Sequence, residues 1–255
     1  MDLNGNTVLI TGGGSGIGRA IAEDLHARGN KVIIAGRRQH VLRSVVDANP
    51  GMDWIELDLS DPLSIADACT VVKLRHPTLN VIINNAGMMA HDDSGQCLDF
   101  QVMLQQVETN FLGPVQLTSA LIGHLRDQPR ATIVYCTSTL ALAPLPFAAI
   151  YSATKAALHS YVQSQRAMLR QTNVTVREVA PNLVATALQG APDPRAMPVD
   201  AFVERVIEAL GAEVEYVTVE DPATSLITWL SPRIPRLHLV GDGDWRSIHG
   251  AVPAR

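Results

Sequence analysis

The stretch Thr7-Val8-Leu9-Ile10-Thr11-Gly12-Gly13-Gly14-Ser15-Gly16-Ile17-Gly18 decides the fold of this chain. Thr7 to Ile10 is a short apolar run rich in β-branched residues, which predicts a buried strand. After the glycines, apolar residues recur at helical spacing from Ile17 to Leu25, and Gly29 is suited to end that helix in a left-handed conformation. A strand, a glycine turn and a helix in this order predict a backbone that approaches a pyrophosphate closely, with the free N–H groups of the helix facing the anion.

Two other interpretations of the glycine stretch fit less well. A flexible linker would not need the strand and the helix that flank the glycines. A P-loop would need Lys followed by Ser or Thr, and Arg19-Ala20 stands at that place although Gly13 and Gly18 have the required separation. We therefore favour dinucleotide binding over nucleotide hydrolysis.

The same alternation of strand and helix continues along the chain. It predicts an α/β fold: a single-domain Rossmann-type doubly wound parallel sheet of about seven strands, with helices on both faces, over residues 1–255. Further strands are expected at 31–35, 52–57, 79–83, 131–136, 175–179 and 214–219. Helices are expected at 39–48, 61–75, 99–127 (two helices with Gly113-Pro114 between them), 151–170 and 199–210.

Composition narrows the class of protein. The 255 residues are 47% hydrophobic and 18% charged, with a net charge of -5, and without a basic run we expect no nucleic-acid partner. The N-terminus lacks the pattern of a signal peptide and no segment has the length of a membrane span, so the prediction is a cytoplasmic protein without a membrane partner. Cys69, Cys97 and Cys136 are expected as reduced thiols, and the eight scattered histidines give no expectation of a metal.

The end of the second predicted strand bears on the choice of cofactor. An acidic residue at this place binds the adenosine ribose hydroxyls, whereas an arginine pairs with a 2'-phosphate. Gly36-Arg37-Arg38 offers two guanidinium groups and no carboxylate. NADP(H) is therefore the preferred cofactor, NAD(H) stays possible, and the alternative is that both arginines are ordinary surface residues.

A second stretch, Tyr151-Ser152-Ala153-Thr154-Lys155, predicts proton chemistry. In a helix, Tyr151 and Lys155 lie on the same face one turn apart. A nearby cation favours the phenolate and would bring the tyrosine toward the range useful for proton transfer at neutral pH. The spacing alone also arises by chance, but Ser138 lies thirteen residues upstream, at the end of another predicted strand.

Together these motifs carry a family resemblance over about residues 5–188. In order and spacing the chain resembles the short-chain dehydrogenase/reductase family, in the glycine pattern of 11–18, Asp58, Asn84-Asn85-Ala86-Gly87, Asn110, Ser138 and Tyr151-x-x-x-Lys155. Ala35-Gly36-Arg37-Arg38 and the run from Tyr151 to Ala157 resemble in particular a branch of small bacterial reductases, the D-alanine-esterification-type oxidoreductases.

The resemblance implies roles for individual residues. The catalytic residues would be Asn110, which holds a water in a proton relay, with Ser138, Tyr151 and Lys155. The cofactor-binding residues would be Gly12, Ser15, Gly16, Ile17, Gly18, Arg37, Arg38, Asp58, Leu59, Asn85, Ala86, Gly87, Tyr151, Lys155, Pro181, Val184 and Thr186. Asn182 stands where the family usually has glycine, and because asparagine tolerates glycine-like backbone angles we expect that turn to persist.

The expected reaction is hydride transfer between the nicotinamide and a carbonyl or secondary alcohol of a small substrate. Alternatives are an NAD-dependent alcohol dehydrogenase, a non-catalytic dinucleotide-binding protein, and an epimerase or dehydratase, for which the chain is short. A flap near 187–200 and an atypical tail at 221–255 are expected, as is a homodimer or homotetramer formed through 99–127 and 151–170. Apolar residues that could line the pocket, or simply fill the core, suggest a fairly apolar substrate: Met88, Met89, Leu140, Leu142, Phe147 and Leu188.

Overall fold

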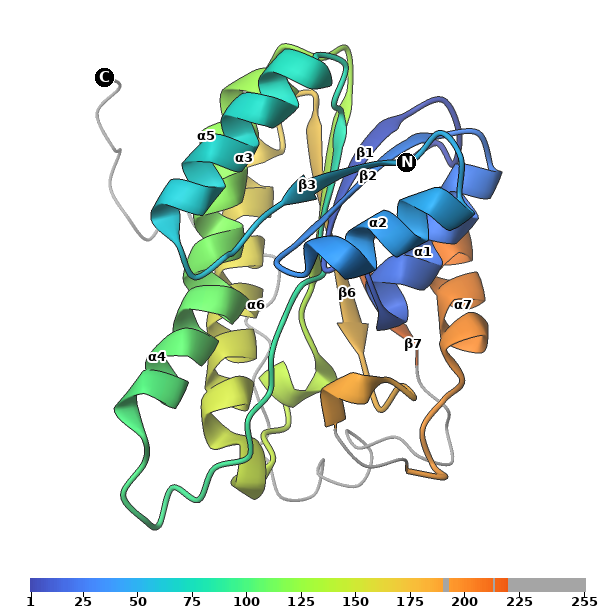
Figure 1. Ribbon diagram of the computed structural model, residues 1–255. Helices are drawn as coiled ribbons and strands as arrows, with labels where there is room; N and C mark the ends of the chain where they lie inside the picture. Colours follow the sequence, from blue (N-terminus) through green and yellow to red (C-terminus); the bar gives the residue numbers. More distant parts are fainter. Residues whose placement is uncertain (190–192, 213, 220–255) are drawn as a thin grey trace, which may run out of the picture.

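The computed structural model describes residues 1–189, 193–212 and 214–219. It contains a seven-stranded sheet in the order β3-β2-β1-β4-β5-β6-β7, and all of its strand pairs are parallel (Figure 1). This confirms the predicted α/β class. The tail at 221–255, with its segments 231–236 and 242–245, lies outside the described residues.

The strands are short, and β1 and β4 are buried throughout. Their bounds are β1 Thr7–Thr11, β2 Lys31–Gly36, β3 Asp53–Glu56, β4 Val81–Asn84, β5 Ala131–Cys136, β6 Val174–Pro181 and β7 Tyr216–Val219. The helices are α1 Gly16–Ala27, α2 Gln39–Ala48, α3 Pro62–Arg75, α4 Phe100–Val107, α5 Gly113–Arg126, α6 Ala149–Leu169 and α7 Val199–Gly211.

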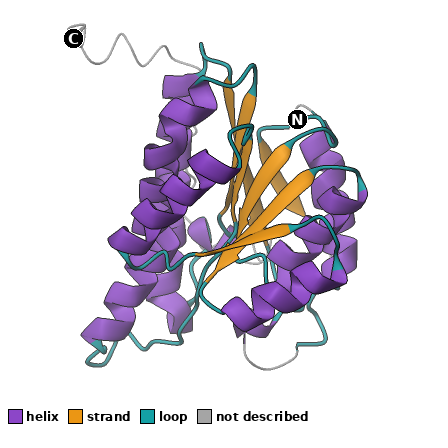
Figure 2. Ribbon diagram, turned by 45° about the horizontal axis from the view of Figure 1, so that its top comes forward, coloured by secondary structure: helices purple, strands orange, loops and turns teal. Residues whose placement is uncertain are grey.

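Helices cover both faces of the sheet (Figure 2). Val8 and Ile10 of β1 pack in a core with residues of α1, α2 and α7, whereas Leu9 points to the opposite core with α3, α5 and α6. Successive side chains of a strand face opposite sides. Strands buried on both faces therefore consist of nearly continuous apolar runs, which is why they could be predicted from the sequence.

The order of the strands reverses between β1 and β4, which both pair in the centre of the sheet. In open α/β sheets the crevice beyond the carboxyl ends of two such strands is where ligands bind. The glycine turn follows β1 and Asn85 follows β4, so the two motifs meet at this crevice.

The region 99–127 differs from the prediction of two helices separated at Gly113-Pro114. α4 passes through a π-helical segment, Glu108–Leu112, directly into α5, and Gly113 and Pro114 are the first residues of α5. Because Pro114 has no N–H, the α-helical hydrogen bond to the carbonyl of Asn110 cannot form, and the π-helical segment lies at this interruption. The wider π-helical turn accommodates Pro114, so the chain passes from α4 to α5 without the helix ending.

Candidate active site

The glycine turn has the geometry that its sequence predicted. Gly12 and Gly16 have φ angles of 70° and 54°, in the left-handed region that favours glycine. A Cβ on Gly18 would lie 2.3 Å from Nδ2 of Asn85 and 2.6 Å from the carbonyl oxygen of Gly12, so only glycine lets α1 start this close to β1 and β4. Gly29 ends the helix region with a φ of 86°, as predicted.

The start of α1 suits an anion. Ser15 is the N-cap residue, and among the described residues no side chain caps these N–H groups and no acid lies in the first turn. Unpaired N–H groups and the positive end of the helix dipole thus face the crevice. The Ser15 hydroxyl instead accepts a hydrogen bond of 3.2 Å from Arg38.

The turn after β4 is tied to β1. Thr11 Oγ1 accepts hydrogen bonds from the N–H groups of Asn85 and Ala86, each 3.0 Å long, and the Asn85 amide donates to the Thr11 carbonyl at 3.0 Å. Asn85, Ala86 and Gly87 therefore flank the glycine turn at the crevice, as their sequence position predicted.

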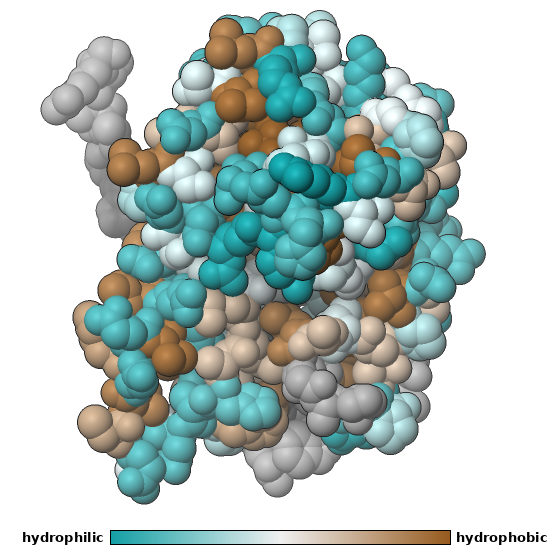
Figure 3. Space-filling model, in the orientation of Figure 1, coloured by the Kyte–Doolittle hydropathy of each residue, from teal (hydrophilic) through white to brown (hydrophobic). Residues whose placement is uncertain are grey.

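The two arginines after β2 line an open cavity of about 790 Å³ with residues of α2. Figure 3 shows hydrophilic side chains gathered over α2 in the middle of the view. A nitrogen of Arg37 lies 3.9 Å from the carboxylate of Asp58, whose other oxygen accepts two bonds from Ser60. The side chain of Leu59 is buried in the core, so only its backbone can face a cofactor.

Ser138, Tyr151 and Lys155 come together at the carboxyl end of β5. Ser138 follows β5, while Tyr151 and Lys155 lie in the first two turns of α6 and are 6% and 3% exposed. The Lys155 ammonium lies 5.7 Å from the centre of the Tyr151 ring and donates a 2.8 Å hydrogen bond to the carbonyl of Cys136. A phenol, a hydroxyl and an ammonium thus converge in one nearly buried place.

Burial dominates the electrostatics of this group. It raises the pKa of Tyr151 to about 12, against a hydrogen bond with Ser138 that lowers it. It also lowers the pKa of Lys155 to about 8, because an ammonium loses its hydration there. The sequence led us to expect a lowered tyrosine pKa, but burial of the phenol raises it instead.

Asn110 is fully buried in the π-helical segment. Its side chain accepts from the N–H of Met88 and donates to the Met88 carbonyl, both at 2.8 Å, and it also donates to Thr154 at 3.1 Å. The side chain thus fixes the loop after Gly87 to α6. A Cβ on Gly87 would lie 3.3 Å from Oδ1 of Asn110 and 3.5 Å from the Lys155 ammonium, so the three residues are neighbours.

The segment after β6 closes over the glycine turn. Thr186 lies against Gly16, within 3.4 Å of the position a Cβ would take there, and Val184 is buried. The described part of the predicted flap returns to this segment, because Met197 pairs with Val184. The expectation that Asn182 adopts a glycine-like backbone angle is wrong. Among the described residues only glycines have a positive φ, so the turn after Pro181 forms without such an angle.

The apolar residues expected around the substrate divide into two groups. Met88, Met89 and Leu140 are half-buried, while Leu142, Phe147 and Leu188 are 39%, 52% and 40% exposed. Large apolar side chains left partly open are the ones available to a ligand. His91 is exposed and packs edge-on against Phe147, with ring centres 5.5 Å apart.

Sequence reasoning missed Asp92. Its two carboxylate oxygens accept hydrogen bonds of 2.9 Å from the N–H groups of Ala149 and Ile150, the first residues of α6. Ala148, the N-cap residue by position, has no side chain that could cap the helix. A helix that starts without its own cap was a signal that another segment supplies one.

Comparison with known proteins identifies the family. The family model described as short chain dehydrogenase matches residues 6–195. The uncharacterized oxidoreductase DltE of Bacillus subtilis is 40% identical over 74% of this chain and 75% of its own length. Dehydrogenase/reductase SDR family member 7B of Bos taurus is 30% identical over 90% of this chain and 78% of its own.

A solved structure agrees over nearly the whole length. A short chain dehydrogenase from Burkholderia cenocepacia J2315, in complex with NADP, has a TM-score of 0.81 at 25% identity and covers 98% of both chains. In the part of this chain that the structure describes, no helix is long and apolar enough to cross a membrane. The fold, the motifs and these relatives show that this chain belongs to the short-chain dehydrogenase family and is a dehydrogenase/reductase.

Proposed function

We propose that this protein is an NADP(H)-dependent oxidoreductase that transfers a hydride between the nicotinamide and the carbonyl or secondary alcohol of a small, fairly apolar substrate. The observation that carries the proposal is the convergence of Ser138, Tyr151 and Lys155 at the crevice beside the glycine turn. A protein that only bound a dinucleotide would not need this group of three.

The glycine turn fits a dinucleotide. A Cβ on Gly13 would lie 2.5 Å from Ile34, Gly12 and Gly16 have positive φ angles, and the first turn of α1 carries no acid. In our proposal Gly12, Ser15, Gly16 and Ile17 hold the pyrophosphate, and Asn85, Ala86, Gly87, Pro181, Val184 and Thr186 bound the rest of the cofactor. When bound, the cofactor supplies or accepts the hydride.

The proton chemistry belongs to this chain. Because burial keeps the pKa of Tyr151 at about 12, its phenol is protonated at neutral pH and can give a proton to the substrate oxygen. The Ser138 hydroxyl donates a hydrogen bond to the same oxygen and stabilises the charge that develops on it. A protonated Tyr151 favours the reductive direction, and the ammonium of Lys155 would assist the phenolate needed for the reverse reaction.

Asn110 would supply the end of the proton relay. Pro114 has no N–H, so the Asn110 carbonyl cannot accept the usual α-helical hydrogen bond from the residue four positions on. A carbonyl that loses this donor in the interior is a suitable acceptor for a water. The side-chain oxygen of Asn110 and the Lys155 ammonium both lie beside Gly87, and in our proposal the water connects Asn110 to Lys155.

The preference for NADP(H) rests on Arg37 and Arg38. They line an open cavity with residues of α2, among them Asp47, and no acid stands at the end of β2, where a 2'-phosphate would lie. The solved relative from Burkholderia cenocepacia has NADP bound. The carboxylate of Asp58, 3.9 Å from Arg37, holds Arg37 near this place, and in our proposal Asp58 lies beside the adenine.

The direct experiment is a titration of the purified protein with NADPH and with NADH, followed by nicotinamide fluorescence. We expect tighter binding of NADPH, and a loss of about 10² to 10⁴ in its affinity when Arg37 and Arg38 are both changed to Ala, since two charged hydrogen bonds of about 1.5–3 kcal/mol each are removed. Arg75→Ala is the matched control, because Arg75 is as exposed as Arg37 but pairs with Asp53. Tighter NADH binding would support an NAD-dependent alcohol dehydrogenase instead.

We also propose that the protein forms a homodimer or homotetramer through the helices of 99–127 and 151–170. Phe100 and Met168 are 64% and 73% exposed, and Leu112 is 47% exposed, which supports a contact surface there. Light scattering during size-exclusion chromatography measures the oligomeric state, and a monomer at micromolar concentration would refute this part of the proposal.

A further inference from the structure

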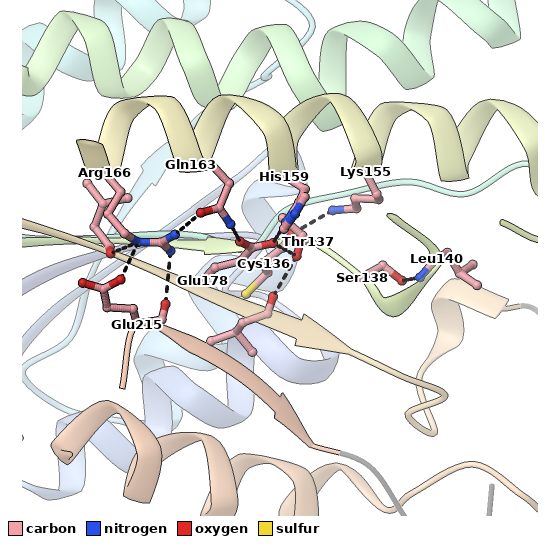
Figure 4. A network of polar contacts seen from close by, with 12 residues as sticks. Cys136, Thr137, Ser138, Leu140, Lys155, His159, Gln163, Arg166, Glu178 and Glu215 are labelled. Atoms are coloured by element: carbon pink, nitrogen blue, oxygen red, sulfur yellow. Dashed lines mark hydrogen bonds and ion pairs between the residues drawn. The ribbon is translucent and has the colours of Figure 1, made fainter. Parts of the chain in front are cut away.

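The carboxylate of Glu178 is a buried charge that the proposed reaction does not use. Glu178 lies in β6 and is 0% exposed. Its Oε1 accepts a 2.7 Å hydrogen bond from the Thr137 hydroxyl and lies 2.8 Å from Nδ1 of His159, and its Oε2 accepts from Gln163 at 3.4 Å (Figure 4). A buried carboxylate costs free energy that an apolar residue would avoid, so these contacts need an explanation.

The first contact fixes the end of β5. Thr137 lies between Cys136, whose carbonyl accepts from Lys155, and Ser138, whose hydroxyl bonds with Tyr151. The Thr137 N–H donates to the carbonyl of Val179 at 2.8 Å, and its hydroxyl donates to Glu178. Glu178 therefore holds the residue that joins the two groups contributed by β5.

The second contact fixes α6. His159 and Gln163 follow Lys155 at intervals of four residues, so the three side chains lie along one face of the helix. Figure 4 shows this face turned toward Glu178. Gln163 in turn accepts a 2.7 Å bond from Arg166, which donates to the carbonyls of Val176 and Glu215.

We propose that Glu178 is a positioning residue, which holds α6 against the carboxyl end of β5 through His159 and Thr137 and so sets where Lys155 and Tyr151 lie relative to Ser138. Its importance for catalysis rests on the proposed function, but the positioning itself does not. Glu178 contacts neither substrate nor cofactor in this proposal.

The test uses the lysines as probes. The chain has three, Lys31, Lys73 and Lys155, so a ¹³C-lysine NMR spectrum of the whole protein is simple, and Lys155→Arg assigns the third signal. In Thr137→Val the bond to Glu178 is lost while its charge stays. We expect the titration midpoint of Lys155 to fall by about half a pH unit or more, because a displaced Cys136 carbonyl no longer stabilises the ammonium. Lys31 and Lys73, both exposed, keep their midpoints.

His159→Leu is the second variant and removes the contact between Glu178 and His159 of α6. Removing any positive charge on His159 would raise the pKa of Lys155, so a fall reports displacement and not a lost charge. The other titratable groups that face the ammonium, Tyr151 and Cys136, are unchanged in both variants. This variant also serves if Thr137→Val does not fold, as judged by circular dichroism.

Two controls distinguish a specific effect on the position of Lys155 from a general weakening of the packing between β5 and α6. Thr137→Ser keeps the hydroxyl and should restore the wild-type midpoint. Tyr135→Phe removes another hydrogen bond between β5 and α6, the partly buried 2.9 Å bond to Gln165, and should leave the titration midpoint of Lys155 unchanged. A folded Thr137→Val or His159→Leu protein with an unshifted Lys155 would overturn the proposal, whereas an NADPH titration without binding would refute only the proposed function.

Discussion

The ammonium of Lys155 lies 5.7 Å from the centre of the Tyr151 ring, yet its hydrogen bond goes to the carbonyl of Cys136, 2.8 Å away. The two residues are thus neighbours, and within the described residues their polar atoms form no direct hydrogen bond with each other. Their charges are governed by burial, which raises the pKa of the phenol to about 12 and lowers that of the ammonium to about 8.

Tyr151→Phe should separate chemistry from binding. Removing the phenolic hydroxyl takes away the proton donor, so turnover of a carbonyl panel with NADPH should fall by about 10² to 10⁴. Fluorescence titration should show NADPH affinity within a few-fold of wild type. Tyr161→Phe, a half-buried tyrosine later in α6, is the control and should retain activity. Wild-type turnover in Tyr151→Phe would exclude Tyr151 as the proton donor.

Stability should depend on pH through Lys155. Its pKa falls from 10.5 in the unfolded chain to about 8 in the fold, so near pH 7 the ammonium destabilises the fold by about 3 kcal/mol. Between these two pKa values the unfolded state binds more protons, and stability from this group rises with pH. Lys155→Met should therefore stabilise the protein in urea unfolding near pH 7 but only slightly at about pH 10.

Comparison within one pH cancels the contributions of titratable groups that do not interact with Lys155. Cys136 is an exception, because burial raises its pKa to about 11 and the Lys155 ammonium lowers it. Lys73→Met, at an exposed position of α3, is the control and should not give the large gain in free energy of unfolding near pH 7, because its side chain is not buried. If the gain from Lys155→Met were equal at both pH values, burial would not control the charge of Lys155.

Two helical glycines should respond oppositely to alanine. A Cβ on Gly18 would lie 2.6 Å from the Gly12 carbonyl oxygen, so Gly18→Ala should cost about 1–3 kcal/mol of unfolding free energy and weaken NADPH binding. Gly123 in α5 has nothing within 4 Å of that position, so Gly123→Ala should stabilise by about 0.5–1 kcal/mol. Urea denaturation measures both, and an equal response would contradict the close approach at Gly18.

Asp92 and Asp99 form a matched pair of helix caps. Asp92 accepts from the first two N–H groups of α6, and Asp99 accepts from Gln101 and Val102 at the start of α4. Changing either to Ala should cost about 1 kcal/mol of unfolding free energy. Only Asp92→Ala should also reduce turnover, by about tenfold or more, because it loosens the turn that carries Tyr151. Equal turnover in the two variants would mean that the cap has no catalytic role.

The sequence by itself determined the fold and the composition of the candidate site. Continuous apolar runs such as Val32 to Ala35 mark strands covered on both faces, and the glycines from Gly12 to Gly18 mark a place where strand, turn and helix approach closely. The spacing of Tyr151 and Lys155 placed both on one face of a helix. These features are local, so periodicity and residue type are enough to predict them.

Only the tertiary structure decided how these groups interact. Asp92 and the two N–H groups that it caps at the start of α6 are 57 and 58 residues apart in the sequence. Thr137 and Glu178, which share a hydrogen bond, are 41 residues apart. No local pattern encodes such contacts. The hydrogen-bond acceptor of Lys155 is likewise set by the tertiary structure. So is the direction of the pKa shifts of Tyr151 and Lys155, because the cost of a charge depends on all the groups that exclude water from it.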